Sequence, residues 1–164
     1  GARLNYEVDD CFIQQVLLPL MKQGVFVVFM GVFDKYAMAE EKYPLLKSQS
    51  VFVGFIKDVL AVNELCDIYI NPKRNGGGTS VIEAMVKGLP PVSLNEGDVS
   101  LGAGEDFCLQ DYSEMVQRAL RLKDDEEYYR AMSQKARERA AVMLDGASAF
   151  WETFQRIEKL PDFQ

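Results

Sequence analysis

Three consecutive glycines, Gly76, Gly77 and Gly78, stand directly before a segment with helical spacing. Because glycine has no Cβ, such a run lets a ligand approach the backbone closely. The amides that open a helix, here near Thr79 and Ser80, lack intrahelical partners and lie at the positive end of the helix dipole. The glycine run therefore indicates a binding site for a phosphate or diphosphate group.

The same residues allow a purely structural interpretation. Ser80 and Glu83 have the spacing of a capping box, in which each side chain binds a free amide at the helix start. The Glu83 carboxylate could instead accept hydrogen bonds from the two hydroxyls of a ribose. Spacing alone leaves both interpretations of Glu83 open.

The composition narrows the class of protein. A chain of 164 residues with 48% hydrophobic and 26% charged residues predicts one globular domain over residues 1–164. The net charge of -7 argues against nucleic acid as a partner. The sequence has three cysteines without the spacing of metal ligands, Cys11, Cys66 and Cys108. They are predicted to be free thiols, which indicates a reducing compartment and hence a cytoplasmic protein.

Three absences from the sequence exclude further classes of protein. The sequence contains no histidine, which excludes a Ser-His-Asp triad, a Cys-His pair and His-based metal sites within this chain. No apolar run reaches the roughly 18 to 20 residues that a membrane span needs, so we expect none. The N-terminus also lacks the layout of an export signal.

The elements that must position the glycine run alternate between strand and helix. Apolar, β-branched or aromatic segments predict strands at residues 25–30, 51–56, 67–70, 91–94 and 107–109. Helical periodicity predicts helices at residues 12–20, 33–43, 58–66 and 80–87, with further helices after residue 112. Pro19 lies inside the first of these and is expected to kink or shorten it.

This alternation is typical of an α/β protein with a Rossmann-like, doubly wound parallel sheet. We expect helices on both faces of the sheet and extra C-terminal helices. In such a sheet, ligands bind beyond the carboxyl ends of the strands, where the glycine run would lie.

Three segments, V-F-V-G-F at 51–55, D-I-Y-I-N-P at 67–72 and G-G-G-T-S-V-I-E-A-M-V-K-G-L-P-P-V at 76–92, resemble a known family in order and spacing. The chain is similar to the C-terminal, donor-binding half of retaining GT-B glycosyltransferases of the group 1 type. The resemblance implies transfer of a sugar from a nucleotide diphosphate sugar to an acceptor with retained configuration. It also implies an N-terminal acceptor domain in the same full-length protein, and little transfer by this chain alone.

The resemblance implies roles for individual residues. Glu83 would bind the donor ribose. The loop before it would hold the diphosphate and sugar, and the turn after the second strand would lie beside the base. The diphosphate loop comprises Asn75, Gly76, Gly77, Gly78 and Thr79, and the base turn comprises Gly54, Phe55 and Ile56.

The sequence departs from the family pattern at two places. The family often carries a second glutamate where Asn75 stands. A G-R-L-x-x-E-K pattern, which neutralises the diphosphate, is matched by Arg3 but not by Val8. Arg3 would then be a diphosphate contact, and Lys73 or Arg74 could supply the charge that Val8 does not.

Two other functions remain compatible with these motifs: a sugar-nucleotide epimerase of GT-B-like fold, and a non-catalytic nucleotide-binding module. The resemblance implies no metal and no cofactor, only the nucleotide sugar as a substrate. The motifs do not name the base, the sugar or the acceptor.

Overall fold

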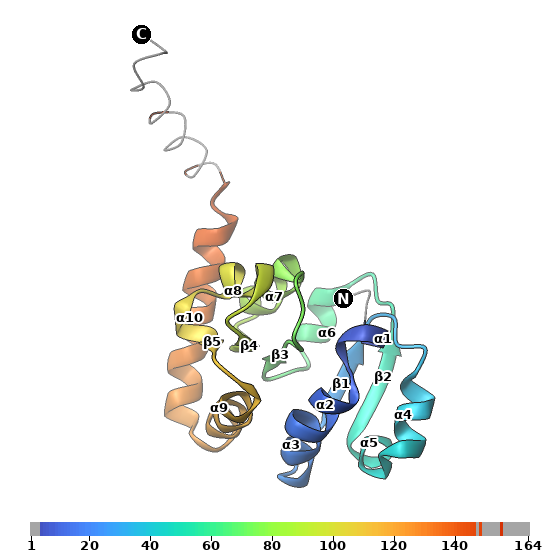
Figure 1. Ribbon diagram of the computed structural model, residues 1–164. Coiled ribbons are helices and arrows are strands. Elements are labelled where there is room, and N and C mark those ends of the chain that lie inside the picture. Colours follow the sequence, from blue (N-terminus) through green and yellow to red (C-terminus); the bar gives the residue numbers. More distant parts are fainter. Residues whose placement is uncertain (1–3, 147, 149–154, 156–164) are drawn as a thin grey trace.

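Parallel strands alternate with helices along the chain (Figure 1). The structure, a computed structural model, describes residues 4–146 together with residues 148 and 155. Within these residues the strands are β1 (Val27–Met30), β2 (Ser50–Gly54), β3 (Tyr69–Ile70), β4 (Pro91–Leu94) and β5 (Cys108–Leu109). The helices of the first half are α1 (Leu4–Glu7), α2 (Asp10–Phe12), the π-helical η1 (Ile13–Leu17), α3 (Leu18–Lys22), α4 (Tyr36–Lys42), α5 (Pro44–Gln49) and α6 (Val59–Asn63). Those of the second half are α7 (Gly78–Val86), α8 (Gly97–Ala103), the 3-10 helix η2 (Glu105–Phe107), α9 (Tyr112–Asp124) and α10 (Glu126–Leu144).

The predicted α/β class is confirmed, and every observed strand pairing is parallel. The hydrogen bonds, however, divide the strands between two sheets. One sheet pairs β1 with β2, and the other has the order β3-β4-β5. β1 and β3 therefore each have one edge that pairs with no described strand. Figure 1 shows these two strands at adjacent positions.

The first predicted helix is longer than Pro19 suggested. α2, η1 and α3 follow one another without a break and end at Lys22, and Gly24 then adopts a left-handed φ of 81°. In the π turn, the amide of Leu18 donates to the carbonyl of Ile13. This local widening of the helix accommodates a proline that has no amide of its own to donate.

The sequence reasoning missed the helices α1, α5 and α8 and the 3-10 helix η2. α5 begins at Pro44, where we expected only the end of the preceding helix. Proline is suited to the first turn of a helix because the amides there have no intrahelical partner. α8 begins at Gly97, in a segment where no helix was predicted.

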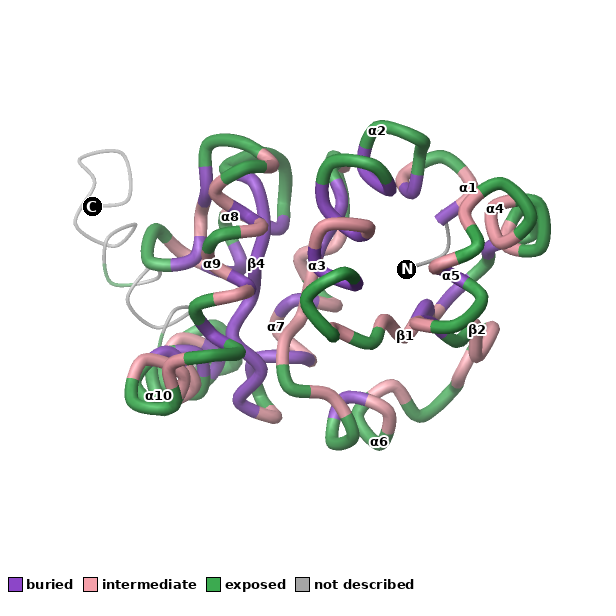
Figure 2. The backbone as a smooth tube through the Cα atoms, turned by 90° about the horizontal axis from the view of Figure 1, so that it is seen from below, coloured by how far each residue is buried: buried purple, intermediate pink, exposed green. Residues whose placement is uncertain are grey.

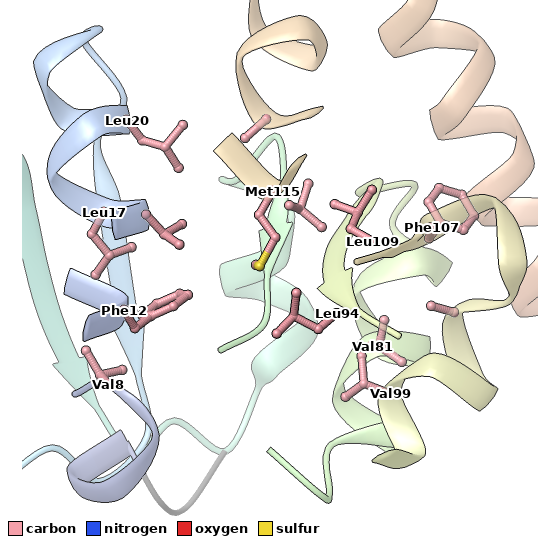
Figure 3. Packing of buried hydrophobic residues seen from close by; sticks show 14 of the residues in the cluster. Val8, Phe12, Leu17, Leu20, Val81, Leu94, Val99, Phe107, Leu109 and Met115 are labelled. Atoms are coloured by element: carbon pink, nitrogen blue, oxygen red, sulfur yellow. The ribbon is translucent and has the colours of Figure 1, made fainter. Parts of the chain in front are cut away.

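One hydrophobic core joins the two halves of the molecule. α9 packs on η1 and α3, and α7 packs on α8 and α10. The predicted C-terminal helices are thus confirmed as α9 and α10, and Asp111 and Asp125 cap their N-termini. Figure 3 shows Phe12 and Leu17 on the side of the N-terminal helices, and Met115 on the facing side. Figure 2 shows how the buried segments, β4 among them, lie inside the exposed helices.

In the described part of the chain, no helix is both long enough and apolar enough to cross a membrane.

Candidate functional site

The glycine loop follows β3 and leads into α7, at the carboxyl ends of the strands (Figure 1). Gly77 precedes the helix with φ 105° and ψ 9°, a left-handed conformation that favours glycine. The first hydrogen bond of the helix runs from the Val81 amide to the Gly77 carbonyl, at 3.1 Å. The amides of Gly78, Thr79 and Ser80 precede this bond and have no intrahelical acceptor, which is the arrangement that binds an anion.

The capping-box interpretation of Glu83 is wrong. α7 begins at Gly78, so Ser80 is already its third residue and Gly77 is the N-cap. The Ser80 hydroxyl donates back to the Gly77 carbonyl, at 3.0 Å, instead of capping an amide. Glu83 lies in the second turn, half-buried, and no side-chain hydrogen bond ties it to the described residues. Its carboxylate is therefore not used to cap the helix.

The buried side chain of Arg74 supports the glycine loop from the interior of the protein. The Arg74 side chain is only 8% exposed, and its Nη1 donates to the Glu7 carboxylate at 3.1 Å. Its Nη2 donates to the Tyr69 hydroxyl at 3.1 Å and to the Ser80 hydroxyl at 2.9 Å. Arg74, predicted as a possible phosphate contact, thus points inward and is neutralised by Glu7.

Tyr69 completes this network. Its hydroxyl lies 3.1 Å from the Ser80 hydroxyl and donates to the Asn71 side-chain oxygen at 3.1 Å. Burial raises the pKa of Tyr69 above its usual value, although the neighbouring Arg74 opposes the shift. The phenol therefore stays neutral at physiological pH and can serve as a donor.

The three glycines have different surroundings. A Cβ on Gly77 would lie 2.3 Å from Nη2 of Arg74, so glycine is required both for the backbone conformation and for the guanidinium. A Cβ on Gly78 would lie 3.1 Å from the Asp98 carbonyl, which brings α7 close to the start of α8. A Cβ on Gly76 would meet nothing within 4 Å. Gly76 is thus the glycine that faces open space.

The remaining polar residues of the loop lie at the surface. Asn75 and Thr79 are exposed, and the Asn75 carbonyl accepts the Asp98 amide at 3.0 Å. Lys73 forms a surface ion pair with Glu96, at 3.1 Å. Because this pair is exposed and weak, Lys73 can exchange Glu96 for an anionic ligand at little cost.

The turn predicted to lie beside the base follows β2 at the same edge of the molecule (Figure 1). Gly54 has a left-handed φ of 72°, and a Cβ there would meet nothing within 4 Å. Phe55 is 75% exposed, an unusual position for a large aromatic side chain. Ile56 is half-buried, and α6 begins three residues later.

α6, which follows this turn, packs on α7, the helix that carries Glu83. The two helices are joined by an ion pair between Lys87 and Glu64. Glu83 precedes Lys87 by four residues, so both side chains lie on the same face of α7. Glu83 lies one turn closer to the start of α7 than this ion pair does.

Two features of the site are not established by the spacing of residues in the sequence. The predicted diphosphate contact Arg3 lies outside the described residues. The roles of Tyr69 and Ser80 in holding Arg74 were missed, and so was the pairing of Arg74 with Glu7, which lies 67 residues away in the chain. The only signal in the sequence for this pair is the opposite charge of the Glu7 carboxylate and the Arg74 guanidinium. Within the described residues, no group of three Cys, Asp or Glu side chains gathers as a metal site.

A parallel α/β fold with a glycine loop and a helix N-terminus at its carboxyl edge defines a Rossmann-like ligand-binding domain. Residues 3–125 match the sequence profile of the glycosyl transferases group 1 family. The chain belongs to this family. No curated protein sequence matches the chain.

Several solved structures share the fold. A mutant of TarM from S. aureus, in complex with UDP, fondaparinux and alpha-GlcNAc-glycerol, matches with a TM-score of 0.77 at 19% identity, over 98% of this chain and 34% of that one. HepE from Anabaena, in complex with UDP and glucose, matches with a TM-score of 0.66 at 15% identity, over 90% of this chain and 44% of that one. The pneumococcal O-GlcNAc transferase GtfA, in complex with UDP and GlcNAc, matches with a TM-score of 0.65 at 12% identity, over 92% and 33%. The chain therefore spans less than half the length of these three proteins, and its fold corresponds to the C-terminal portion of GT-B enzymes.

Proposed function

We propose that this chain is the donor-binding domain of a glycosyltransferase that uses a nucleotide diphosphate sugar. The observation that carries the proposal is the start of α7, where the amides of Gly78, Thr79 and Ser80 have no intrahelical acceptor. Gly76 opens this helix start to a ligand, and Arg74 holds the loop in place from the buried side. A diphosphate bound there receives hydrogen bonds from backbone amides and the favourable field of the helix dipole.

The two side-chain contacts that we propose lie on either side of the diphosphate. Glu83 projects from α7 toward α6 and accepts hydrogen bonds from the ribose hydroxyls. The turn at Gly54, Phe55 and Ile56 borders the base, with the exposed ring of Phe55 available for contact. Asn75 and Thr79 face the sugar and the diphosphate, and Lys73 together with Arg3 supplies positive charge.

The full-length protein, in this proposal, places an N-terminal acceptor domain against the carboxyl edge of the described domain. The partial coverage of TarM, HepE and GtfA supports this arrangement. Transfer proceeds with retention, and the leaving diphosphate is stabilised by helix amides and cationic side chains, so that no metal is required. The isolated chain binds the donor but transfers little sugar.

Titration calorimetry with UDP, GDP and ADP tests donor binding. UDP is the first probe, because the three related structures contain it. We expect saturable binding of at least one nucleoside diphosphate, and weaker binding of the matching monophosphate. If none of the three binds at millimolar concentration, the proposal fails.

The substitution Glu83→Ala tests the ribose contact. Loss of two charge-assisted hydrogen bonds, each worth roughly 1.5–3 kcal/mol, predicts an affinity for the nucleotide that is weaker by about a hundredfold or more. Glu64→Ala is the matched control, since it removes the same charge from the C-cap of neighbouring α6, at the pair with Lys87. We expect less than a twofold change for the control. Equal effects of the two substitutions would show that only the net charge matters.

Retention is tested on the full-length protein. The anomeric configuration of the glycosidic bond in the product is compared with that of the sugar nucleotide by NMR. The same configuration is expected, with activity that survives EDTA. An inverted product would contradict the proposed mechanism, and an epimerised sugar nucleotide formed without transfer would favour the epimerase alternative.

A further inference from the structure

The guanidinium of Arg74 lies against the start of α7, the helix end that carries the free amides. A Cβ on Gly77 would lie 2.5 Å from Nε of Arg74 and closer still to Nη2, so the guanidinium touches the backbone that enters the helix. Nη2 also donates to the Ser80 hydroxyl in the first turn, at 2.9 Å. The positive charge of Arg74 therefore lies next to the free amides that open the helix.

The hydrogen-bonding capacity of this buried guanidinium is not used up. The side chain is 8% exposed, and Nε is buried without a hydrogen-bond partner among the described residues. A buried N–H group without an acceptor is rare, because it gives up its hydration and gains no bond in exchange. On the side that faces Gly77, the charge of Arg74 is thus incompletely compensated.

The counter-charge of Arg74 is bound at a different nitrogen. Glu7 accepts a hydrogen bond from Nη1, at 3.1 Å, whereas Nη2, Nε and Cζ are the atoms nearest to the Cβ position of Gly77. The guanidinium is therefore closer to the helix start than the carboxylate is. Because the Coulomb energy falls with distance, an anion bound to the free amides interacts more strongly with Arg74 than with Glu7.

Burial makes this charge effective. The side chains of Arg74 and Glu7 are 8% and 12% exposed, so that water and salt screen their charges only weakly. Lys73, another cation of the same loop, is 62% exposed and is paired with Glu96 at the surface. Solvent screens an exposed pair of this kind strongly. Of these two cations, Arg74 is the one whose field reaches the helix start with little screening.

We propose that Arg74 is a positioning residue that strengthens the binding of the donor diphosphate without contacting it. Its buried charge adds to the positive end of the α7 dipole, and its bond to Ser80 keeps the first turn of the helix in place. Glu7 opposes the effect on the ligand, while it offsets the cost of burying Arg74. The inference rests on the proposed function, because it assigns a further residue to the same diphosphate site.

The two members of this ion pair are expected to change nucleotide affinity in opposite directions. Glu7→Gln removes the opposing charge, so a nucleoside diphosphate is expected to bind about three- to tenfold more tightly, although the fold is less stable. Arg74→Met removes the favourable charge, so binding is expected to weaken by about the same factor. If the pair served only to hold the loop in shape, both substitutions would loosen the loop and weaken binding.

Titration calorimetry on the chain of residues 1–164 tests these signs, with whichever of UDP, GDP and ADP the unmodified chain binds most tightly. Arg74→Lys keeps the charge without the planar fork of donors, and is expected to retain most of the affinity that Arg74→Met loses. Glu64→Gln is the matched control, because it removes a carboxylate from the pair with Lys87, and a change below about twofold is expected. Urea denaturation establishes beforehand that each variant is folded.

Tighter binding by Glu7→Gln together with weaker binding by Arg74→Met supports the inference. Unchanged or weaker binding by Glu7→Gln overturns it, and so does equal tightening by Glu64→Gln, because net charge alone would then be responsible. If Glu7→Gln does not fold, the comparison of the two Arg74 variants decides, and equal affinities of Arg74→Lys and Arg74→Met overturn the inference. Failure of the unmodified chain to bind any of the three nucleotides refutes the proposed function as well, whereas the other negative results leave it standing.

Discussion

The substitution Gly77→Ala provides a sharp test of how the glycine loop is held. At φ 105° a residue with a Cβ is strained, at a cost of about 1–2 kcal/mol. The new Cβ would also lie 2.3 Å from the guanidinium of Arg74, which must move. That movement weakens the hydrogen bonds of Arg74 to Glu7, Tyr69 and Ser80, and the loss of one bond to a charged group costs roughly 1.5–3 kcal/mol.

The two contributions together predict a loss of about 2.5–5 kcal/mol in the free energy of unfolding. In urea denaturation, with a slope of about 2 kcal/mol per molar, the midpoint falls by about 1–2.5 M. Gly76→Ala is the matched control, because Gly76 has no left-handed φ and no neighbour within 4 Å of its Cβ position. Its effect is expected to stay within about 0.5 kcal/mol.

A double-mutant cycle separates the two contributions. In an Arg74→Met background the guanidinium is absent, so Gly77→Ala should cost only the backbone strain of about 1–2 kcal/mol. An unchanged cost in that background would show that Arg74 does not determine the need for glycine. If Gly77→Ala were no worse than Gly76→Ala, the whole explanation of the loop would be refuted.

Three further substitutions test other parts of the structure. Gly102→Ala places a Cβ 2.8 Å from Cγ1 of Val81, at the contact of α8 with α7. We expect this substitution to lower the free energy of unfolding, measured in urea, by about 1–3 kcal/mol. An effect below about 0.5 kcal/mol would contradict the close packing of the two helices. Glu7→Gln leaves the buried guanidinium of Arg74 without its counter-charge, and we expect the free energy of unfolding to fall by about 3 kcal/mol or more. An unchanged free energy of unfolding would show that the pair is not buried in solution. Tyr69→Phe is tested by measuring the free energy of unfolding as a function of pH. Because the pKa of Tyr69 is raised in the folded state, the stabilising contribution of the neutral phenol is complete below about pH 10 and is lost as the pH rises above it. The unfolding free energy of the unmodified protein should therefore fall more steeply above pH 10 than that of Tyr69→Phe, and parallel curves would contradict the assigned burial.

Local patterns in the sequence were sufficient for the class of fold and for the place of the candidate site. The strands at β1, β2 and β4 were visible as apolar runs because side chains of buried parallel strands are apolar on both faces. The glycine run located the start of α7 to within two residues. These features depend on neighbouring residues only, and so spacing reveals them.

The start of α5 shows where local patterns mislead. Pro44 was taken as a signal that the preceding helix ends, and it does end, at Lys42. The same proline also opens α5, because it fits the first turn of a helix as well as it interrupts the middle of one. The rule for proline was correct, but a short helix packed on α3 and β2 could not be inferred from it.

The sequence by itself determined the alternation of strands and helices, the glycine loop before α7 and the family to which the chain is similar. Only the tertiary structure decided what each loop residue contacts. Arg74 was read as a candidate for the phosphate, yet it is bound to Glu7 across 67 positions of the chain. The division of the strands into two sheets likewise depends on which strand edges meet. Both outcomes arise from contacts between distant segments, which form on folding and leave no periodic signal in the sequence.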